Sequence, residues 1–288
     1  MKNYLNDFRH IEIQTKKLLS SNFLGNFKSA FRGNGLVFSE FKTREEGEDT
    51  SNIDWLVSRR EGKYLVRKME EERQLSILFL FDFSETMNFS FGKSKIDTMW
   101  NIFFMIALSA IEDGDKVGAL FFGKNTLHFS PFSNKKLGIF NIYKFGTEYN
   151  NSSSKNEKKS FDDVSKYIKT MNLKKKLIFV MTDNIDCDEK VLREMSFGND
   201  IVFINIFHHI ENTLDFDKDM IINLGNTKEG LFVDTFDKEK KDLYKALRKK
   251  KIEDFEKKIK KSGGDYIFID DSKNIFKEFF IFMKKRGA

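Results

Sequence analysis

Cysteine, proline and long apolar runs are all scarce in this sequence of 288 residues. The single cysteine, Cys187, excludes an internal disulfide framework and a cysteine-rich zinc site, and it is typical of a reducing compartment. The most apolar stretch, Met99 to Ile111, contains two polar residues and is shorter than the ~20 residues that a membrane-spanning helix needs. The amino terminus has no apolar signal core. We therefore expect a cytoplasmic protein with no direct membrane insertion.

The composition indicates a folded chain. Hydrophobic residues make up 40% and charged residues 33%, and the 33 phenylalanines supply most of the expected core. The net charge of +6 permits acidic partners without demanding them. The densest basic runs, Lys174–Lys176 and Arg248–Lys251, have no aromatic residues interleaved, so we interpret them as solvated faces and expect no nucleic-acid partner.

The chain from Leu75 onward alternates between apolar runs of strand length and segments with helical spacing. Such alternation predicts an α/β fold with a doubly wound, mostly parallel sheet of Rossmann-like topology. The expected strands are 75–81, 116–122, 126–129 (an edge hairpin partner), 177–181, 201–207 and 266–270. One expected helix carries Ile96, Met99, Phe103, Ala107 and Ala110 at helical spacing and ends at Asp113-Gly114. The others cover 161–171, 189–195, 238–260 and 274–285.

The first part of the chain does not follow this pattern. Glycines separate short segments such as 36–41 and 64–68, which predicts a small β-rich annex packed on the sheet. We therefore expect two parts, an N-terminal annex over residues 1–73 and an α/β domain over residues 74–288. The Ser-, Asn- and Lys-rich segment 150–159 is expected to be a loop.

Polar side chains follow two of the expected parallel strands. Ligands of an open parallel sheet bind beyond the carboxyl ends of its strands. Asp82, Ser84 and Thr86 leave the first strand, and Asp183 leaves the strand 177–181. Ser160 is placed as the N-cap of the helix that follows it. Carboxylate and hydroxyl oxygens suit Mg²⁺ or Mn²⁺ rather than zinc.

These residues resemble the metal-ion-dependent adhesion site of von Willebrand factor A domains. The match is the motif Asp82-x-Ser84-x-Thr86 followed by Asp183, with Thr86 where that family prefers serine. Ser160, or alternatively Thr147, stands for the family's separate threonine. The resemblance implies a von Willebrand factor A-like fold and a bound Mg²⁺ (or Mn²⁺ or Ca²⁺) with one position open to a carboxylate from a partner protein. With only two carboxylates, we expect weak cation binding in the absence of a partner.

A second resemblance extends over nearly the whole chain. The segments 27–35, 38–41, 47–49, 53–55, 58–60 and 70–73 are similar, in order and spacing, to the part that precedes the A domain in the bacterial domain-of-unknown-function 58 family. Ser51 and Arg59 depart from that family's pattern. The resemblance implies a non-enzymatic adapter that works with a MoxR-type AAA+ ATPase and with other von Willebrand factor A-domain proteins in the assembly or maturation of proteins. Many relatives carry transmembrane helices ahead of this segment, and we expect none in this chain.

Within the annex, Asp54 and Arg60 suggest a partly buried ion pair beneath Trp55 that fixes the annex to the sheet. Trp55 and Arg60 are alternatively a docking surface for a partner.

Other functions need weighing against the adapter. A metal-dependent phosphoesterase or nuclease would use Asp82 and Asp183, with Asp186 and Asp188 nearby. A phosphatase of the haloacid dehalogenase type would need a second aspartate as its general acid at the position of Ser84. The serine there leaves such an enzyme without its general acid. A purely structural domain with a degenerate site is the third interpretation.

Three motifs are set aside as accidental. Gly118–Lys124 matches most of a phosphate-binding loop, but it lacks the final Ser or Thr and is expected to be a buried strand. His208 and His209 are adjacent at a strand end, so we expect one packed and one exposed residue rather than a metal site. Cys187 is expected to be a small packed or loop residue, not a reactive thiol.

Overall fold

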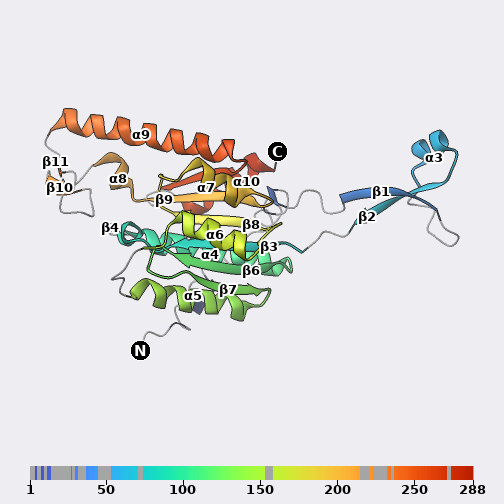
Figure 1. Ribbon diagram of the computed structural model, residues 1–288, viewed down its shortest axis with the longest axis horizontal. Helices are drawn as coiled ribbons and strands as arrows, with labels where there is room; N and C mark the ends of the chain where they lie inside the picture. Colours follow the sequence, from blue (N-terminus) through green and yellow to red (C-terminus); the bar gives the residue numbers. More distant parts are fainter. Residues whose placement is uncertain are drawn as a thin grey trace.

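The structure is a computed structural model that describes residues 4, 8–9, 12–13, 27, 30–31, 37–44, 53–70, 74–91, 93–152, 158–214, 221–223, 232–234, 237–270 and 274–287. Its main body is a three-layer α/β unit around a six-stranded sheet (Figure 1). The strand order is β12-β9-β8-β3-β6-β7. All neighbours are parallel except β6 and β7, which are antiparallel. This arrangement confirms the doubly wound, mostly parallel sheet.

The central strands are buried along their length because helices cover both faces of the sheet. Every residue of β3 after Ser76 and every residue of β8 is buried. The strands are β3 (Ser76–Asp82), β6 (Lys116–Phe122), β7 (His128–Ser133), β8 (Leu177–Thr182), β9 (Asp200–Phe207) and β12 (Asp265–Asp270). The phosphate-loop-like motif therefore lies in β6 and the turn after it, as expected.

Two apolar clusters fill the spaces between the sheet and its helices. Alternate residues of β3 serve the two faces, with Phe79 and Phe81 in one cluster and Leu78 and Leu80 in the other. The phenylalanine-side cluster packs against α4 (Lys95–Glu112), α5 (Lys136–Asn151) and α10 (Ile275–Arg286). The leucine-side cluster packs against α6 (Phe161–Thr170), α7 (Glu189–Ser196) and α9 (Lys238–Lys261).

Helix α5 is the main element that the sequence analysis did not predict. Its buried residues Ile139, Ile142, Tyr143 and Tyr149 recur at helical spacing and face α4 and β6. Two glycines weaken the helical pattern. One of them, Gly146, is needed for packing, because a Cβ there would lie 2.6 Å from a ring carbon of Trp100. The predicted loop 150–159 therefore begins only after Asn151, and its residues 153–157 lie outside the described residues.

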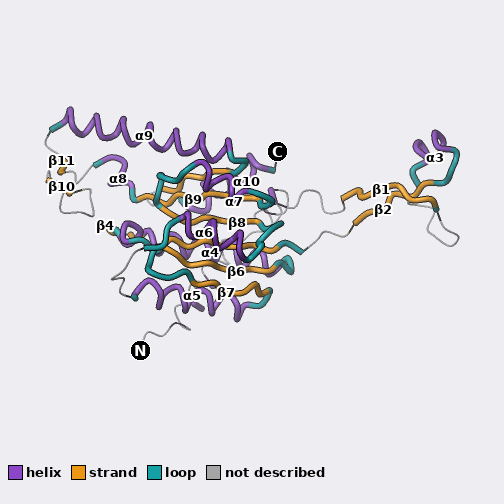
Figure 2. The backbone as a smooth tube through the Cα atoms, viewed as in Figure 1, coloured by secondary structure: helices purple, strands orange, loops and turns teal. Residues whose placement is uncertain are grey.

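The region before β3 divides into two parts. Strands β1 (Val37–Thr43) and β2 (Leu65–Glu70) form an antiparallel hairpin, and α3 (Trp55–Glu61) lies between them in the sequence. Figures 1 and 2 show this hairpin extending away from the main body. The expectation that the annex packs on the sheet is therefore wrong for this hairpin, because helices and other apolar side chains already cover both sheet faces.

The described residues nearer the amino terminus belong to the main body. Phe8 and Phe27 are buried in the phenylalanine-side cluster, and the ring of Phe31 contacts Phe179 of β8 edge-on, with centroids 5.4 Å apart. Residues on both sides of the hairpin thus pack together. The division into residues 1–73 and 74–288 stays a prediction.

Short elements complete the fold. They are the 3₁₀ helix η2 (Glu85–Asn88), the hairpin β4 (Ser90–Phe91) and β5 (Lys93–Ser94), helix α8 (His209–Thr213), and the hairpin β10 (Ile221–Asn223) and β11 (Phe232–Asp234). Within the described ranges, no helix combines the length and the apolar character that crossing a membrane requires.

Candidate functional site

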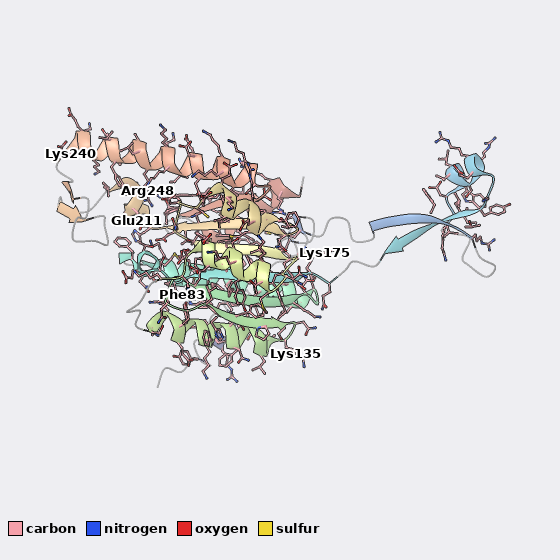
Figure 3. All side chains as sticks on the ribbon, in the orientation of Figure 1. Phe83, Lys135, Lys175, Glu211, Lys240 and Arg248 are labelled. Carbon is pink, nitrogen blue, oxygen red and sulfur yellow. The ribbon has the colours of Figure 1, made fainter. Side chains whose placement is uncertain are left out.

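A cavity of about 820 Å³ lies at the carboxyl ends of the parallel strands. It is lined by all five residues predicted to bind the cation: Asp82, Ser84, Thr86, Ser160 and Asp183. In Figure 3, Glu211, which lines the cavity, and Phe83, which stands between the lining residues Asp82 and Ser84 in the sequence, lie toward one end of the sheet. Lys175 lies at the other end. The sheet thus brings together residues that are 101 positions apart in the chain, because β3 and β8 are parallel neighbours.

The turn after β3 is fixed by the carboxylate of Asp82. Its Oδ1 accepts a hydrogen bond from the backbone N–H of Ser84 (2.8 Å), and its Oδ2 accepts one from the hydroxyl of Thr182 (2.6 Å). Gly123, after β6, has φ +90° and lies so close that a Cβ would be 2.4 Å from the Ser84 nitrogen and 2.7 Å from Asp82 Oδ1. Only glycine fits there, because a side chain would push the turn away from the strand ends.

Three oxygen atoms form a row along the cavity. The hydroxyl oxygens of Ser84 and Thr86 are 3.1 Å apart, and the Thr86 hydroxyl donates to Asp183 Oδ1 at 2.9 Å. Adjacent ligands of an octahedral Mg²⁺ at 2.0–2.1 Å lie about 3 Å apart, so this row has the spacing of neighbouring positions in one coordination shell. The donor chemistry and spacing therefore fit a hard divalent cation held by Ser84, Thr86 and Asp183.

A buried lysine shares the site. The Nζ of Lys95, on α4, is 2.6 Å from Asp183 Oδ2 and 2.8 Å from Glu211 Oε1. The lysine side chain has no exposed surface, and its Nζ is 5.6 Å from the centroid of the Phe89 ring. Asp183 thus directs one oxygen to the hydroxyl row and the other to an ammonium group.

Burial raises the pKa of Asp82 to about 6. The negative charge of Asp183 adds to this effect, whereas the hydrogen bonds from Thr182 and Ser84 oppose it. Any positive charge brought near a carboxyl group in this environment stabilises its ionised form. Asp82 and Asp183 consequently differ in their charged neighbours, since only Asp183 is in direct contact with the ammonium group of Lys95.

Ser160 and Thr147, the alternative loop ligands, are in different places. Ser160 lines the cavity and begins α6, where its backbone N–H donates to Asp163 Oδ2 at 3.0 Å. Its segment reaches the cavity because Lys159 pairs with the backbone of Gly123 and Lys124. Thr147 lies within α5, does not line the cavity, and donates its hydroxyl to the Tyr143 carbonyl at 2.9 Å. Of the two, only Ser160 is placed to contribute.

The other polar residues near the cavity have structural contacts. Asp186 and Asp188 line the cavity, and Asp188 is the N-cap of α7. No cluster of three or more His, Cys, Asp or Glu side chains able to hold a metal occurs in the described part of the chain. His208 is buried and caps α8, whereas His209 is half-buried. Cys187 is buried, and this burial raises the pKa of its thiol to about 12.

The annex residues Trp55 and Arg60 lie on α3, which Figure 1 shows far from α8, the helix that carries the cavity-lining Glu211. Trp55 is 64% exposed, and its ring contacts Tyr64 edge-on. Asp54 is the N-cap of α3, since its Oδ1 accepts from the backbone N–H groups of Leu56 and Val57, both at 3.2 Å. The carboxylate of Asp54 is thus engaged by the start of the helix, and the Arg60 side chain is exposed.

The sequence analysis missed Lys95, Glu211 and Gly123. Lys95 is the first residue of α4, a helix that is buried on nearly every side, and a charged residue among such neighbours is a usable signal for a buried ion pair. In the sequence, Gly123 stands out only as part of the phosphate-loop-like motif. Glu211 gave no signal, because its role depends on a contact across 116 positions of the chain.

Comparisons with known proteins were made for sequence and structure. No curated protein matches the sequence. Similar solved structures include the conserved hypothetical protein BatB of Bacteroides thetaiotaomicron (14% identity over 74% of this chain and 98% of that one, TM-score 0.41). The von Willebrand A domain of SpRpn10 has 13% identity over 73% and 94%, with a TM-score of 0.43. An aerotolerance-related membrane protein of Bacteroides fragilis has 14% identity over 73% and 99%, with a TM-score of 0.40.

At this identity and these TM-scores, the structural similarities add nothing to what the strand order establishes. The family comparison is more informative. The model of the family described as "Protein of unknown function DUF58" matches residues 40–254, which include most of the hairpin, the sheet through β9 and the residues that line the cavity. The chain therefore belongs to the DUF58 family.

Proposed function

We propose that this chain is a protein-interaction module that captures an acidic group of a partner protein through a divalent cation at the carboxyl ends of β3 and β8. The observation that carries the proposal is the row of Ser84, Thr86 and Asp183 oxygens, spaced at 3.1 and 2.9 Å in an open cavity. When bound there, Mg²⁺ (or Mn²⁺ or Ca²⁺) supplies a Lewis acid that accepts a carboxylate oxygen.

The chain's own residues have separate tasks in this proposal. Ser84, Thr86 and Asp183 hold the cation, and Ser160, which lines the same cavity, is the candidate for a further ligand. Asp82 holds the turn through Thr182 and the Ser84 backbone, and it contributes negative charge. This division keeps two hydroxyls in the row, so the site carries little formal charge and leaves affinity to the partner's carboxylate.

Charge around the cavity supports an acidic partner segment. The basic side chains of Lys158, Lys159, Arg248 and Lys251 line the same cavity as the carboxylates. A carboxylate-bearing segment would meet these charges before reaching the cation, which favours association with acidic over basic surfaces. As the family resemblance implies, we propose a MoxR-type AAA+ ATPase as the partner and other von Willebrand factor A-domain proteins as co-workers.

The exposed surface around Trp55 and Arg60 is proposed as a second docking region, at a distance from the cation.

The hydrolase alternative has less support. Asp188 is used as a helix cap, and Asp183 is already in contact with an ammonium group. Two-metal hydrolysis needs several free carboxylates at one point.

The test is co-purification of the full chain with a co-expressed MoxR-type ATPase, with and without a chelator. We expect capture that depends on Mg²⁺ and is lost in Asp82→Asn. We expect no cleavage of a chromogenic phosphate diester probe. Asp162→Asn, an exposed carboxylate that lines the same cavity, is the matched control and should retain capture. Chelator-insensitive capture would refute the metal bridge, and metal-dependent cleavage that is lost in Asp82→Asn would favour the hydrolase.

A further inference from the structure

Lys95 has an environment that the proposed function does not explain. Its Nζ contacts Asp183 Oδ2 and Glu211 Oε1, and its side chain has no exposed surface. Burying an ammonium group is costly unless it is paired and hydrogen-bonded, so a lysine here must have a compensating role.

The position of the ammonium group bears directly on cation binding. Asp183 has two carboxylate oxygens, of which Oδ1 faces the hydroxyl row and Oδ2 faces Lys95. A positive charge already beside this carboxylate reduces its attraction for a second one. The same contact fixes the orientation of the Asp183 carboxylate, because Oδ2 is held at 2.6 Å by a group that cannot move into solvent.

We infer that Lys95 is a built-in counter-cation of Asp183, which holds the site in shape without a metal and keeps its affinity for divalent cations low. This inference rests on the proposed function only in that Asp183 faces the cation. Lys95 is a positioning residue, since its effect is exerted through Asp183.

Glu211 makes the arrangement possible. One of its oxygens accepts from Lys95, and the other accepts from the backbone N–H of His208 at 3.0 Å. The Glu211 carbonyl accepts from the Tyr244 hydroxyl at 2.8 Å, which links α8 to α9. Lys95 therefore stays balanced between two carboxylates from different strand ends, and Asp183 does not have to neutralise it alone.

The inference is tested by Mn²⁺ titration of the full chain, followed by electron paramagnetic resonance and calorimetry. Lys95→Met should bind Mn²⁺ about tenfold or more tightly than the wild type, because a unit charge next to the ligand carboxylate is removed. Its thermal midpoint should fall in chelator and recover with Mn²⁺. Lys95→Arg keeps the charge and should bind Mn²⁺ about as the wild type does.

Lys124→Met is the matched control. Lys124 is also buried, and it makes no ion pair with a carboxylate in the parts of the chain that the structure describes, so Mn²⁺ affinity should not change. If Lys95→Met does not fold, Lys95→Gln keeps a hydrogen-bond donor for Asp183 without the charge, and the same tightening is expected.

The outcomes separate this inference from the proposed function. Unchanged or weaker Mn²⁺ binding in the charge-removing variant overturns the counter-cation role, even where chelator-sensitive partner capture persists. Tighter Mn²⁺ binding together with chelator-insensitive capture in the wild type supports the counter-cation role and refutes the proposed function. Absence of Mn²⁺ binding in every variant overturns both.

Discussion

Replacing Gly123 by alanine should damage the cation site more than the fold. Gly123 has φ +90°, and its Cβ would lie 2.4 Å from the Ser84 nitrogen, 2.7 Å from Asp82 Oδ1 and 2.8 Å from the Phe83 carbonyl carbon. Two of these neighbours are backbone atoms, so rotation of a side chain cannot relieve the contact. The turn that carries Asp82 and Ser84 must move instead.

The magnitude can be separated into two parts. An L-residue at positive φ costs about 1–2 kcal/mol, of which a part is returned by the lower entropy of the unfolded chain. Overpacking against a fixed backbone costs a further ~1–3 kcal/mol. We expect a total loss of about 2–4 kcal/mol, which lowers the thermal midpoint by roughly 3–7 °C in a protein of this size.

Gly114→Ala is the matched control, because Gly114 has φ +81° and nothing within 4 Å of a Cβ. It carries the conformational cost alone and should lose only about 1 kcal/mol. The assay is thermal unfolding in chelator, followed by Mn²⁺ titration below the transition. Gly123→Ala should lose Mn²⁺ binding, and Gly114→Ala should retain it. Equal stabilities of the two variants, with Mn²⁺ binding intact in both, would refute the close approach of β6 to the Asp82 turn.

Three other predictions test separate features. Asp183→Asn should destabilise the metal-free protein by about 1–3 kcal/mol, because it leaves the buried Lys95 with one carboxylate. Asp82→Asn should change the stability little, since burial already disfavours the charge of Asp82. Urea unfolding in chelator compares the two variants, and a larger loss in Asp82→Asn would contradict the pairing of Lys95 with Asp183. Phe27→Ala should cost about 3–5 kcal/mol because this side chain is fully buried in the main core, and a loss below ~1 kcal/mol in urea unfolding would contradict that placement. Cys187 should resist iodoacetamide at pH 8 until the protein unfolds, because burial raises the pKa of its thiol to about 12, and rapid labelling of the native protein would argue against this burial.

The sheet was predictable because burial on both faces leaves a clear pattern. Strands such as β3 and β8 are continuous apolar runs with no competing helical spacing, and the polar residues that follow them mark the strand ends. Helix α5 was less predictable. Its apolar positions are diluted by charged and polar residues, and Gly146 is present because of Trp100, which is far away in the sequence.

The sequence predicted which residues gather at the strand ends, but not the buried charge among them. Asp82, Ser84 and Thr86 are close in sequence, and the parallel arrangement of β3 and β8 brings Asp183 to them. Lys95 meets Asp183 across 88 positions and Glu211 across 116, so no local pattern records that the three would share a buried ion pair. The position of the hairpin was not predictable for a related reason, since the helices and side chains that cover both faces of the sheet come from distant parts of the chain.

The direction of β3 gives the molecule two ends with different surfaces. The hairpin precedes this strand and the candidate cation site follows its last residue, so the two lie beyond opposite ends of the sheet, separated by at least the ~23 Å length of the seven-residue strand (Figure 1). The hairpin end exposes Trp55, Leu56 and Tyr64, whereas the site end exposes oxygens and lysines. A partner seated over the cavity therefore leaves the aromatic end accessible. The two docking regions proposed above therefore lie at opposite ends of one copy of the chain, which leaves room for a partner at each.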